Sequence, residues 1–383
     1  MQKIKNIEFL RIIGCVAIVL LHLFQLLRDF DNDLFQHLRV MTSNGQKAVD
    51  LFFMLSGFFF VLTLNLKQDI WDFVKKKIIR FYPVLLFVAI LWFLVSLTGA
   101  FKFEYYNNIL CLLFLNGTSF VTKAGNIGVF WYVSAMFWVL LALFYSLKIF
   151  KKEQVNLFLA CAIFFCYSFL IHAKGGKINS HNQTFYYIFN VGMLRAIGGI
   201  GIGYFIGEWY KNNIEKIKNY TFNIYQKIFL SVVEFMCIYF TINNLMLHRI
   251  KFKNDMIFIV TFVILIVCFL LKGGFFSRLL DNDFWGKISK YTYSIYMTHA
   301  LVIFTFNGLI WKPHTDYLLE HELLNIFAPI ILALILGIFT YHFVEKPCAQ
   351  YFKERAKSLV AVRERERERE SNTSSSSKIC IKE

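Results

Sequence analysis

Long apolar runs separated by short polar connections recur along most of the chain. A helix needs roughly 20 apolar residues to cross the hydrocarbon core of a bilayer. Runs near this length predict ten membrane-spanning helices, at residues 7–27, 48–66, 82–100, 128–149, 154–172, 185–209, 227–247, 255–272, 289–311 and 323–343. The apolar stretch within 105–122 is shorter, and we predict a re-entrant or interfacial segment there. The pattern indicates an all-α, polytopic transmembrane helix bundle.

Composition agrees with a membrane protein. Hydrophobic residues make up 57% of the chain and charged residues 17%, whereas a soluble domain has about 25% charged residues. The net charge of +16 lies mostly in short connections, where it sets orientation rather than binding nucleic acid. With ten spans and both termini cytoplasmic, these basic connections fall on one side, except for Arg249, Lys251 and Lys253. The eight cysteines form no CxxC pair, so we expect buried thiols and neither a disulfide framework nor a metal site.

The two ends of the chain differ in composition and in predicted structure. We expect the first apolar run to be a retained signal anchor, because ionisable residues interrupt it and no small-residue cleavage site follows. Residues 1–350 are predicted to form one integral-membrane domain. Residues 351–383 form a charged, low-complexity tail that includes RERERERE at 363–370. Such a composition cannot bury a core, so we expect a disordered or solvated tail without a catalytic role.

The first run, EFLRIIGCVAIVLLH at residues 8–22, contains Glu8, Arg11 and His22. Ionisable residues inside hydrocarbon cost roughly 2.5–3.5 kcal/mol each on insertion scales. Arg11 and His22 are eleven residues apart, which is about three helical turns plus 20°, so both lie on one face. That shared face favours a polar path inside the bundle. The alternatives are that Arg11 extends to the headgroups with Glu8 as its partner, and that His22 is interfacial.

Asp50 begins the second run, DLFFMLSGFFF, on the same predicted side of the membrane as His22. A carboxylate can orient an imidazole and raise its basicity. We therefore predict that Asp50 orients His22 as a general base. Asp50 could also cap the start of the second helix, and the two roles are compatible.

Further candidates follow along the chain. The stretch KKKIIRFYP at 75–83 is either a positive-inside anchor or a phosphate-binding patch for a nucleotide-bearing donor, formed by Lys75, Lys76, Lys77 and Arg80. Arg195 interrupts an apolar, glycine-rich run and should be paired. Tyr296 and His299 share one helical stripe with Thr292. Glu345, just before Pro347, is a second-line candidate that could merely mark the interface.

In this order, these residues resemble the acyltransferase 3 family of integral-membrane acyltransferases, which includes O-antigen and exopolysaccharide O-acetylases. The carriers of the resemblance are the Arg and His of the first run, VDLFFMLSGFFF, KKKIIRFYP, KYTYSIYMTHALV and FVEKP, and they extend from residue 7 to about 347. Thr292 stands where the family usually has Ser. The segment FWYVSAMFW lacks the Glu of many sugar O-acetylases, which leaves the acceptor class open.

The resemblance implies a bacterial inner-membrane O-acyltransferase that moves an acyl group, expected to be acetyl, from cytoplasmic acyl-CoA to a hydroxyl of a cell-surface glycan or lipid-linked sugar. We expect no bound cofactor or metal; the expected partners are acyl-CoA, membrane lipid and the acceptor. His22 with Asp50 would act on the acceptor or carry the acyl group. Arg11, the 75–80 patch and Arg195 would contact the donor, with Tyr296, His299 and Glu345 in second place. A transporter or flippase for lipid-linked glycans is the alternative, although the sequence has no visible inverted repeat.

Overall fold

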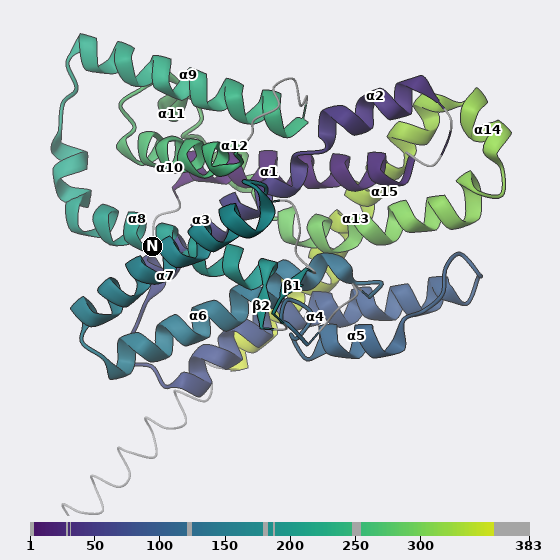
Figure 1. Cartoon of the computed structure of the whole chain (residues 1–383), viewed down its shortest axis with the longest axis horizontal. Helices are drawn as coiled ribbons and strands as arrows, with labels where there is room; N and C mark the ends of the chain where they lie inside the picture. Colours follow the sequence, from purple (N-terminus) through teal and green to yellow (C-terminus); the bar gives the residue numbers. More distant parts are fainter. Residues whose placement is uncertain are drawn as a thin grey trace, which may run out of the picture.

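The computed structural model describes residues 4–27, 30, 32–120, 125–178, 183–186, 188–246 and 254–355. Within these residues the chain is a bundle of long helices (Figure 1). Each of the ten predicted runs contains a helix: α1 (Lys5–Leu27), α3 (Ala48–Thr63), α4 (Ile70–Ser96), α6 (Trp131–Ile149), α7 (Lys152–Lys174), α8 (Val191–Asn219), α9 (Ile224–Met246), α10 (Met256–Leu271), α13 (Thr292–Phe306) and α15 (Glu322–Thr340). The predicted all-α polytopic bundle is confirmed.

Not every one of these helices has the length and apolarity of a membrane span. Among the described residues, 8 helical stretches meet both conditions. Helix α10 is apolar but has only 16 residues. Helix α8 has 29 residues but carries Arg195 near its start and several lysines in its second half, and it does not meet the same conditions. The number of ten spans therefore stays a prediction.

Shorter elements connect the long helices. They are α2 (Asp33–Thr42), η1 (Gly45–Lys47), α5 (Tyr105–Leu112), η2 (Gly128–Phe130), α11 (Phe275–Leu279), α12 (Asp283–Ser289), η3 (Asn307–Trp311), α14 (Thr315–Glu320), η4 (Tyr341–Glu345), and an antiparallel pair of strands, β1 (Thr184–Phe185) and β2 (Phe189–Asn190). The segment predicted as re-entrant or interfacial contains only the 8-residue α5 followed by turns. A helix of that length cannot cross a bilayer.

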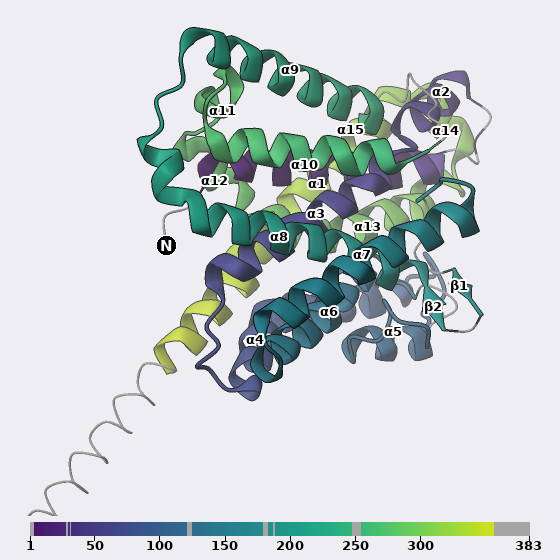
Figure 2. The ribbon, with the colours of Figure 1, turned by 60° about the vertical axis from the view of Figure 1, so that its left-hand side comes forward.

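The connections divide between the two ends of the bundle. The start of α1 and the α3–α4, α6–α7 and α8–α9 connections gather at one end, whereas α2, α14 and the β1–β2 pair lie at the other (Figures 1 and 2). The first end, here called the basic end, carries the lysine-rich connections at 67–77, 148–152 and 211–218. Its cytoplasmic placement stays a prediction from the positive-inside rule. Residues 249, 251 and 253 and the repeat at 363–370 lie outside the described residues.

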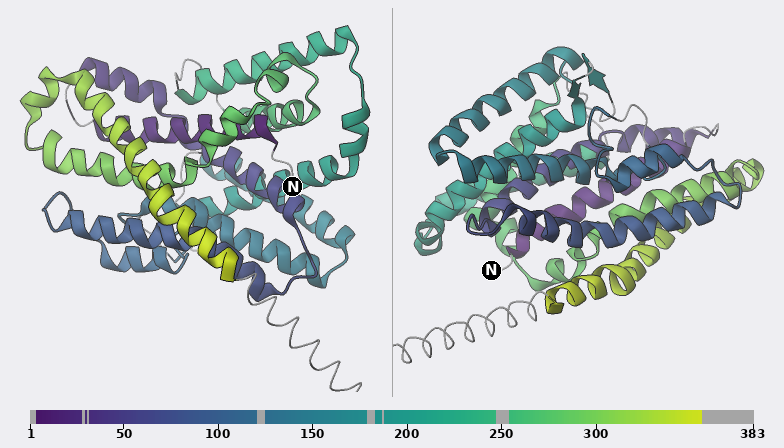
Figure 3. Two further views of the ribbon diagram at one scale, coloured as in Figure 1. Left: turned by 180° about the vertical axis from the view of Figure 1, so that it is seen from behind. Right: turned by 90° about the horizontal axis from the view of Figure 1, so that it is seen from below.

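Two features of the packing position the site. Helices α3 and α8 approach so closely that a Cβ added to Gly57 would lie 2.0 Å from the Ile200 carbonyl oxygen. Small residues allow such approach between membrane helices. Helix α15 crosses the back of the bundle diagonally (Figure 3, left). It continues into the π-helical turn η4, which packs against α4 and holds Glu345 there.

Candidate active site

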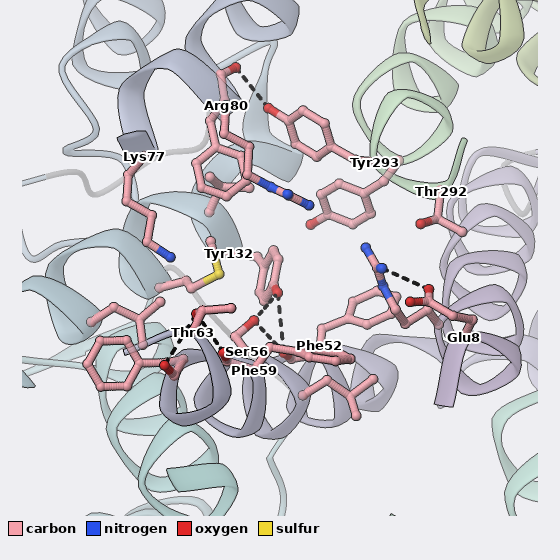
Figure 4. A pocket seen from close by; sticks show the side chains of 18 residues that line it. Glu8, Phe52, Ser56, Phe59, Thr63, Lys77, Arg80, Tyr132, Thr292 and Tyr293 are labelled. Atoms are coloured by element: carbon pink, nitrogen blue, oxygen red, sulfur yellow. Dashed lines mark hydrogen bonds and ion pairs between the residues drawn. The ribbon is translucent and has the colours of Figure 1, made fainter. Parts of the chain in front are cut away.

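A cavity of about 360 Å³ opens among α1, α3, α4, α6 and α13. Three cationic side chains, Arg11, Lys77 and Arg80, line it together with Glu8. In Figure 4, Lys77 and Arg80 extend from one wall and Glu8 lies on the opposite wall, with Tyr132 and Ser56 between them. We call this cavity the cationic pocket. Its other walls are largely aromatic, formed by Phe52, Phe59, Phe60, Phe81, Tyr132, Tyr293 and Tyr296.

Two carboxylates partly balance the three cations. Arg11 Nη1 donates to Glu8 Oε2 at 2.9 Å, and the two side chains are 27% and 7% exposed. The two predictions for Arg11, pairing with Glu8 and lining a polar path, are therefore compatible. Arg11 pairs with Glu8 and also lines the pocket. Outside the residues that line the pocket, Glu345 Oε2 accepts from Ser294 Oγ at 2.6 Å. This carboxylate is within electrostatic reach of Arg80 and Arg11. One positive charge remains in excess, which suits an anionic ligand.

Helical geometry explains which residues of the 75–80 patch reach the pocket. Consecutive residues on a helix point about 100° apart, whereas residues three apart share a face. Lys77 and Arg80 are three apart, and both line the pocket. Lys75 is exposed, and Lys76 Nζ donates to Gln68 Oε1 at 2.6 Å, away from it. Lys77 and Arg80 therefore line the pocket and Lys75 and Lys76 do not, and the binding of a donor phosphate by this patch stays a prediction.

Further along α1, His22 meets His299 of α13. Their ring centroids are 5.3 Å apart. His299 is fully buried, and its Nδ1 lies 3.3 Å from the Ile295 carbonyl oxygen. Among the described residues, its Nε2 has no hydrogen-bond partner. We call these two residues the histidine pair.

Tyr296 connects the histidine pair to the cationic pocket. Its ring lines the pocket and lies 5.8 Å from the His299 ring, between centroids. Its hydroxyl donates to the Val129 carbonyl oxygen at 2.6 Å, which fixes the ring. Cys15 Sγ, between Arg11 and His22 on α1, lies 3.6 Å from the Thr292 carbonyl oxygen of α13. The predicted shared face of Arg11 and His22 is confirmed, and it is turned towards α13.

Asp50 does not orient His22, so that prediction is wrong. Arg195 binds both oxygens of Asp50, with Nε to Oδ1 at 3.1 Å and Nη2 to Oδ2 at 2.8 Å. Both side chains are 1% exposed. Asp50 also does not cap α3, whose N-cap is Lys47. The close packing of α3 on α8 brings the two charges together, and a buried arginine needs such a partner.

Arg195, which was predicted to contact the donor, is bound by groups of the protein itself. Besides Asp50, its Nη2 donates to the Gln46 carbonyl oxygen at 3.0 Å. Its guanidinium carbon lies 5.4 Å from the centroid of the Trp131 ring. The side chain does not line the cationic pocket. The sequence showed that this arginine had to be paired, but not with which carboxylate.

The sequence reasoning missed several residues at this site. Tyr132 lies in the pocket, and its hydroxyl is 2.9 Å from that of Ser56, which in turn donates to the Phe52 carbonyl oxygen at 2.7 Å. Tyr293 closes another wall, and its hydroxyl donates to the Phe81 carbonyl oxygen at 2.9 Å. Their sequence signal is only a hydroxyl inside an apolar run, which occurs at many other positions.

Two kinds of chemistry meet in this arrangement. A cluster of arginine and lysine can bind phosphate groups. Imidazoles can abstract and return protons. Among the described residues, no group of three His, Cys, Asp or Glu side chains is placed to hold a metal ion.

Comparison with known families gives a match over most of the chain. A family model described as an acyltransferase domain matches residues 4–342. The matched region contains the pocket residues on α1, α3, α4, α6 and α13 and both histidines, and it ends three residues before Glu345. No curated protein and no solved structure matches the chain.

Proposed function

The chain belongs to the acyltransferase 3 family of membrane acyltransferases, and from this premise we propose that it moves an acetyl group from acetyl-CoA to a hydroxyl of a cell-surface glycan or lipid-linked sugar. We further propose that it lies in a bacterial inner membrane with its basic end in the cytoplasm. One observation carries the proposal. The cationic pocket and the histidine pair share a wall, Tyr296.

The donor would bind in the cationic pocket. CoA carries several phosphates, and Arg11, Lys77 and Arg80 provide cations from two helices. Charge-assisted hydrogen bonds to phosphate are about twice as strong as neutral ones. Arg11 and Lys77 are partly buried between the helices, where a local dielectric lower than that of water strengthens such bonds further. The thioester end would then point along α1 towards the histidine pair.

The acceptor chemistry would take place at His22. This imidazole is partly exposed, whereas His299 is fully buried. His22 would take the proton of the acceptor hydroxyl while the hydroxyl oxygen attacks the thioester carbonyl. The carbon–sulfur bond then breaks, and the proton passes to the departing thiolate of CoA. His299 replaces Asp50 as the neighbour that positions His22.

The test combines a purified assay with glycan mass spectrometry. His22→Ala should lower acetyl transfer at least about 100-fold, the lower range for losing a positioned acid–base group. Surface glycans from cells carrying this variant should lack the mass of one acetyl group per modified sugar, with the glycan otherwise complete. His37→Ala is the matched control, because His37 is exposed on α2 and belongs neither to the histidine pair nor to the lining of the cationic pocket.

Two results would reject the proposal. Full acetyl transfer by a properly inserted His22→Ala variant would exclude this mechanism. Loss of the whole glycan on deleting the gene, with no change in acetylation, would indicate a transporter of lipid-linked glycans instead.

A further inference from the structure

Three aromatic rings meet where the cationic pocket approaches the histidine pair. They belong to Phe52 of α3, Tyr132 of α6 and Tyr296 of α13, and all three line the pocket. The ring centroids are 5.8 Å apart for Phe52 and Tyr132, 6.0 Å for Tyr132 and Tyr296, and 6.4 Å for Phe52 and Tyr296. Aromatic rings with centroids about 4.5–7 Å apart are in contact. The three rings therefore form a closed cluster, which we call the aromatic triangle.

The aromatic triangle lies between the pocket cations and the histidine pair. On α1, Gly14 comes three residues after Arg11, and a Cβ added to Gly14 would lie 2.9 Å from Phe52 Cε1. The Phe52 ring thus packs on α1 just beyond Arg11. On α13, Tyr296 lies with its ring 5.8 Å from the His299 ring, between centroids. Neither residue of the histidine pair is among the described residues that line the pocket. A thioester that moves along α1 from the pocket to the histidine pair therefore meets the three rings.

The three rings are not held equally. The Tyr296 hydroxyl donates to the Val129 carbonyl oxygen at 2.6 Å. The Tyr132 hydroxyl lies 2.9 Å from Ser56 Oγ and 3.3 Å from the Phe52 carbonyl oxygen (Figure 4). The Phe52 side chain has no polar atom, so only packing holds its ring, and it is partly exposed. Phe52 is therefore the member of the triangle that can turn aside without breaking a hydrogen bond.

We propose that the aromatic triangle limits the size of the acyl group, with Phe52 as the residue that determines this specificity. The inference rests on the proposed acyl transfer. The Phe52 ring turns aside far enough for an acetyl group, while the two tyrosine rings, fixed by their hydroxyls, keep the opening too narrow for a longer chain. Each methylene that an apolar site cannot accommodate changes kcat/KM by about 10- to 200-fold.

The experiment compares acetyl-CoA and butyryl-CoA as donors for the purified full-length protein. The acceptor is surface glycan from cells in which the gene is deleted, and release of the CoA thiol gives kcat/KM for each donor. The wild-type protein should prefer acetyl-CoA by at least about tenfold. Phe52→Ala removes the ring and should lower this preference at least about tenfold, through a gain on butyryl-CoA. Phe52→Leu, a smaller reduction in width, repeats the test if Phe52→Ala fails to fold.

A second variant should shift the preference in the opposite direction. The methyl group of Gly14→Ala would press on the far end of the Phe52 ring and hinder its turning. Its preference for acetyl-CoA should exceed that of the wild type. Phe59→Ala is the matched control, because Phe59 also lines the pocket from α3 but does not belong to the triangle. It should keep the wild-type ratio of the two donors, and an equal loss of preference in this variant would overturn the role of Phe52.

The outcomes separate this inference from the function on which it rests. If the wild type releases CoA and Phe52→Ala keeps the wild-type preference, the triangle does not select the acyl group, and the proposed acyl transfer still stands. Equal use of the two donors by the wild type would overturn the inference in the same way. If the wild type releases CoA from neither donor, the proposed acyl transfer is rejected and the inference with it.

Discussion

Two arginine–carboxylate pairs within the described part of the bundle differ in how many hydrogen-bond donors they leave open. Arg195 and Asp50 join α8 to α3 through two hydrogen bonds, and both side chains are 1% exposed. Arg11 and Glu8 lie on one helix, share one hydrogen bond, and Arg11 is 27% exposed. Arg195 donates at least three hydrogen bonds to the protein, whereas Arg11 donates one to Glu8 and has guanidinium donors left for a ligand.

The difference separates a structural charge from one that can act on a substrate. From sequence alone, both arginines are unfavourable charges within apolar runs, and the insertion cost is the same for each. The structure offsets this insertion cost differently for the two arginines. For Arg195 the contacts with Asp50, Gln46 and Trp131 offset it. For Arg11 the contact with Glu8 offsets only part of it, and a bound donor would offset the rest.

Breaking the inter-helix pair should have the largest effect. Asp50→Ala leaves the Arg195 guanidinium buried without its carboxylate, which costs roughly 3–5 kcal/mol for a buried pair. The yield and the thermal unfolding temperature in detergent should fall sharply. The double variant Asp50→Leu/Arg195→Met removes both charges and should recover much of that stability. If Asp50→Ala unfolds at the wild-type temperature and fails only in acyl transfer, Asp50 is a catalytic residue and the comparison fails.

Changing the pocket cations should have a smaller effect, on the donor. Arg80→Gln and Arg11→Gln each remove charge-assisted hydrogen bonds worth about 1.5–3 kcal/mol. We expect the KM for acetyl-CoA to rise roughly 10- to 100-fold, with the unfolding temperature nearly unchanged. Lys75→Gln is the matched control, since Lys75 lies on the same helix and outside the pocket. An equal rise in KM for Lys75→Gln would mean that overall charge at the basic end, rather than the pocket, binds the donor.

The sequence predicted what helical periodicity can determine. The ten helical runs follow from apolar length, and the shared face of Arg11 and His22 follows from their spacing. Both are properties of a single helix. Helical periodicity also places Lys77 and Arg80 on one face of α4 and Lys75 and Lys76 elsewhere. Which of these faces lines the pocket became known only from the structure.

Contacts between helices were beyond such reasoning. The sequence offered His22 as the partner of Asp50 and showed that Arg195 needed a partner, but it did not show that Asp50 and Arg195 meet. This contact depends on how closely α3 packs on α8, which small residues such as Gly57 and Gly203 allow. Tyr132 was missed for the same reason, because only the packing of α6 against α3 brings its hydroxyl to Ser56.

The smallest expected effect comes from removing the neutral hydrogen bond between Tyr132 and Ser56, which tests whether an uncharged group of the pocket acts on the substrate. Tyr132→Phe removes one hydroxyl from the pocket wall, while Ser56 keeps its bond to the Phe52 carbonyl oxygen. A neutral hydrogen bond contributes about 0.5–1.5 kcal/mol. The KM for acetyl-CoA should therefore rise by about tenfold at most, and kcat should stay close to the wild-type value. A fall in kcat of about 100-fold or more, with KM unchanged, is the loss expected for a hydroxyl that stabilises developing charge on the acyl oxygen. That result would move Tyr132 from the wall of the donor pocket to the reacting atoms, and would show that an uncharged residue can matter more than the cations around it.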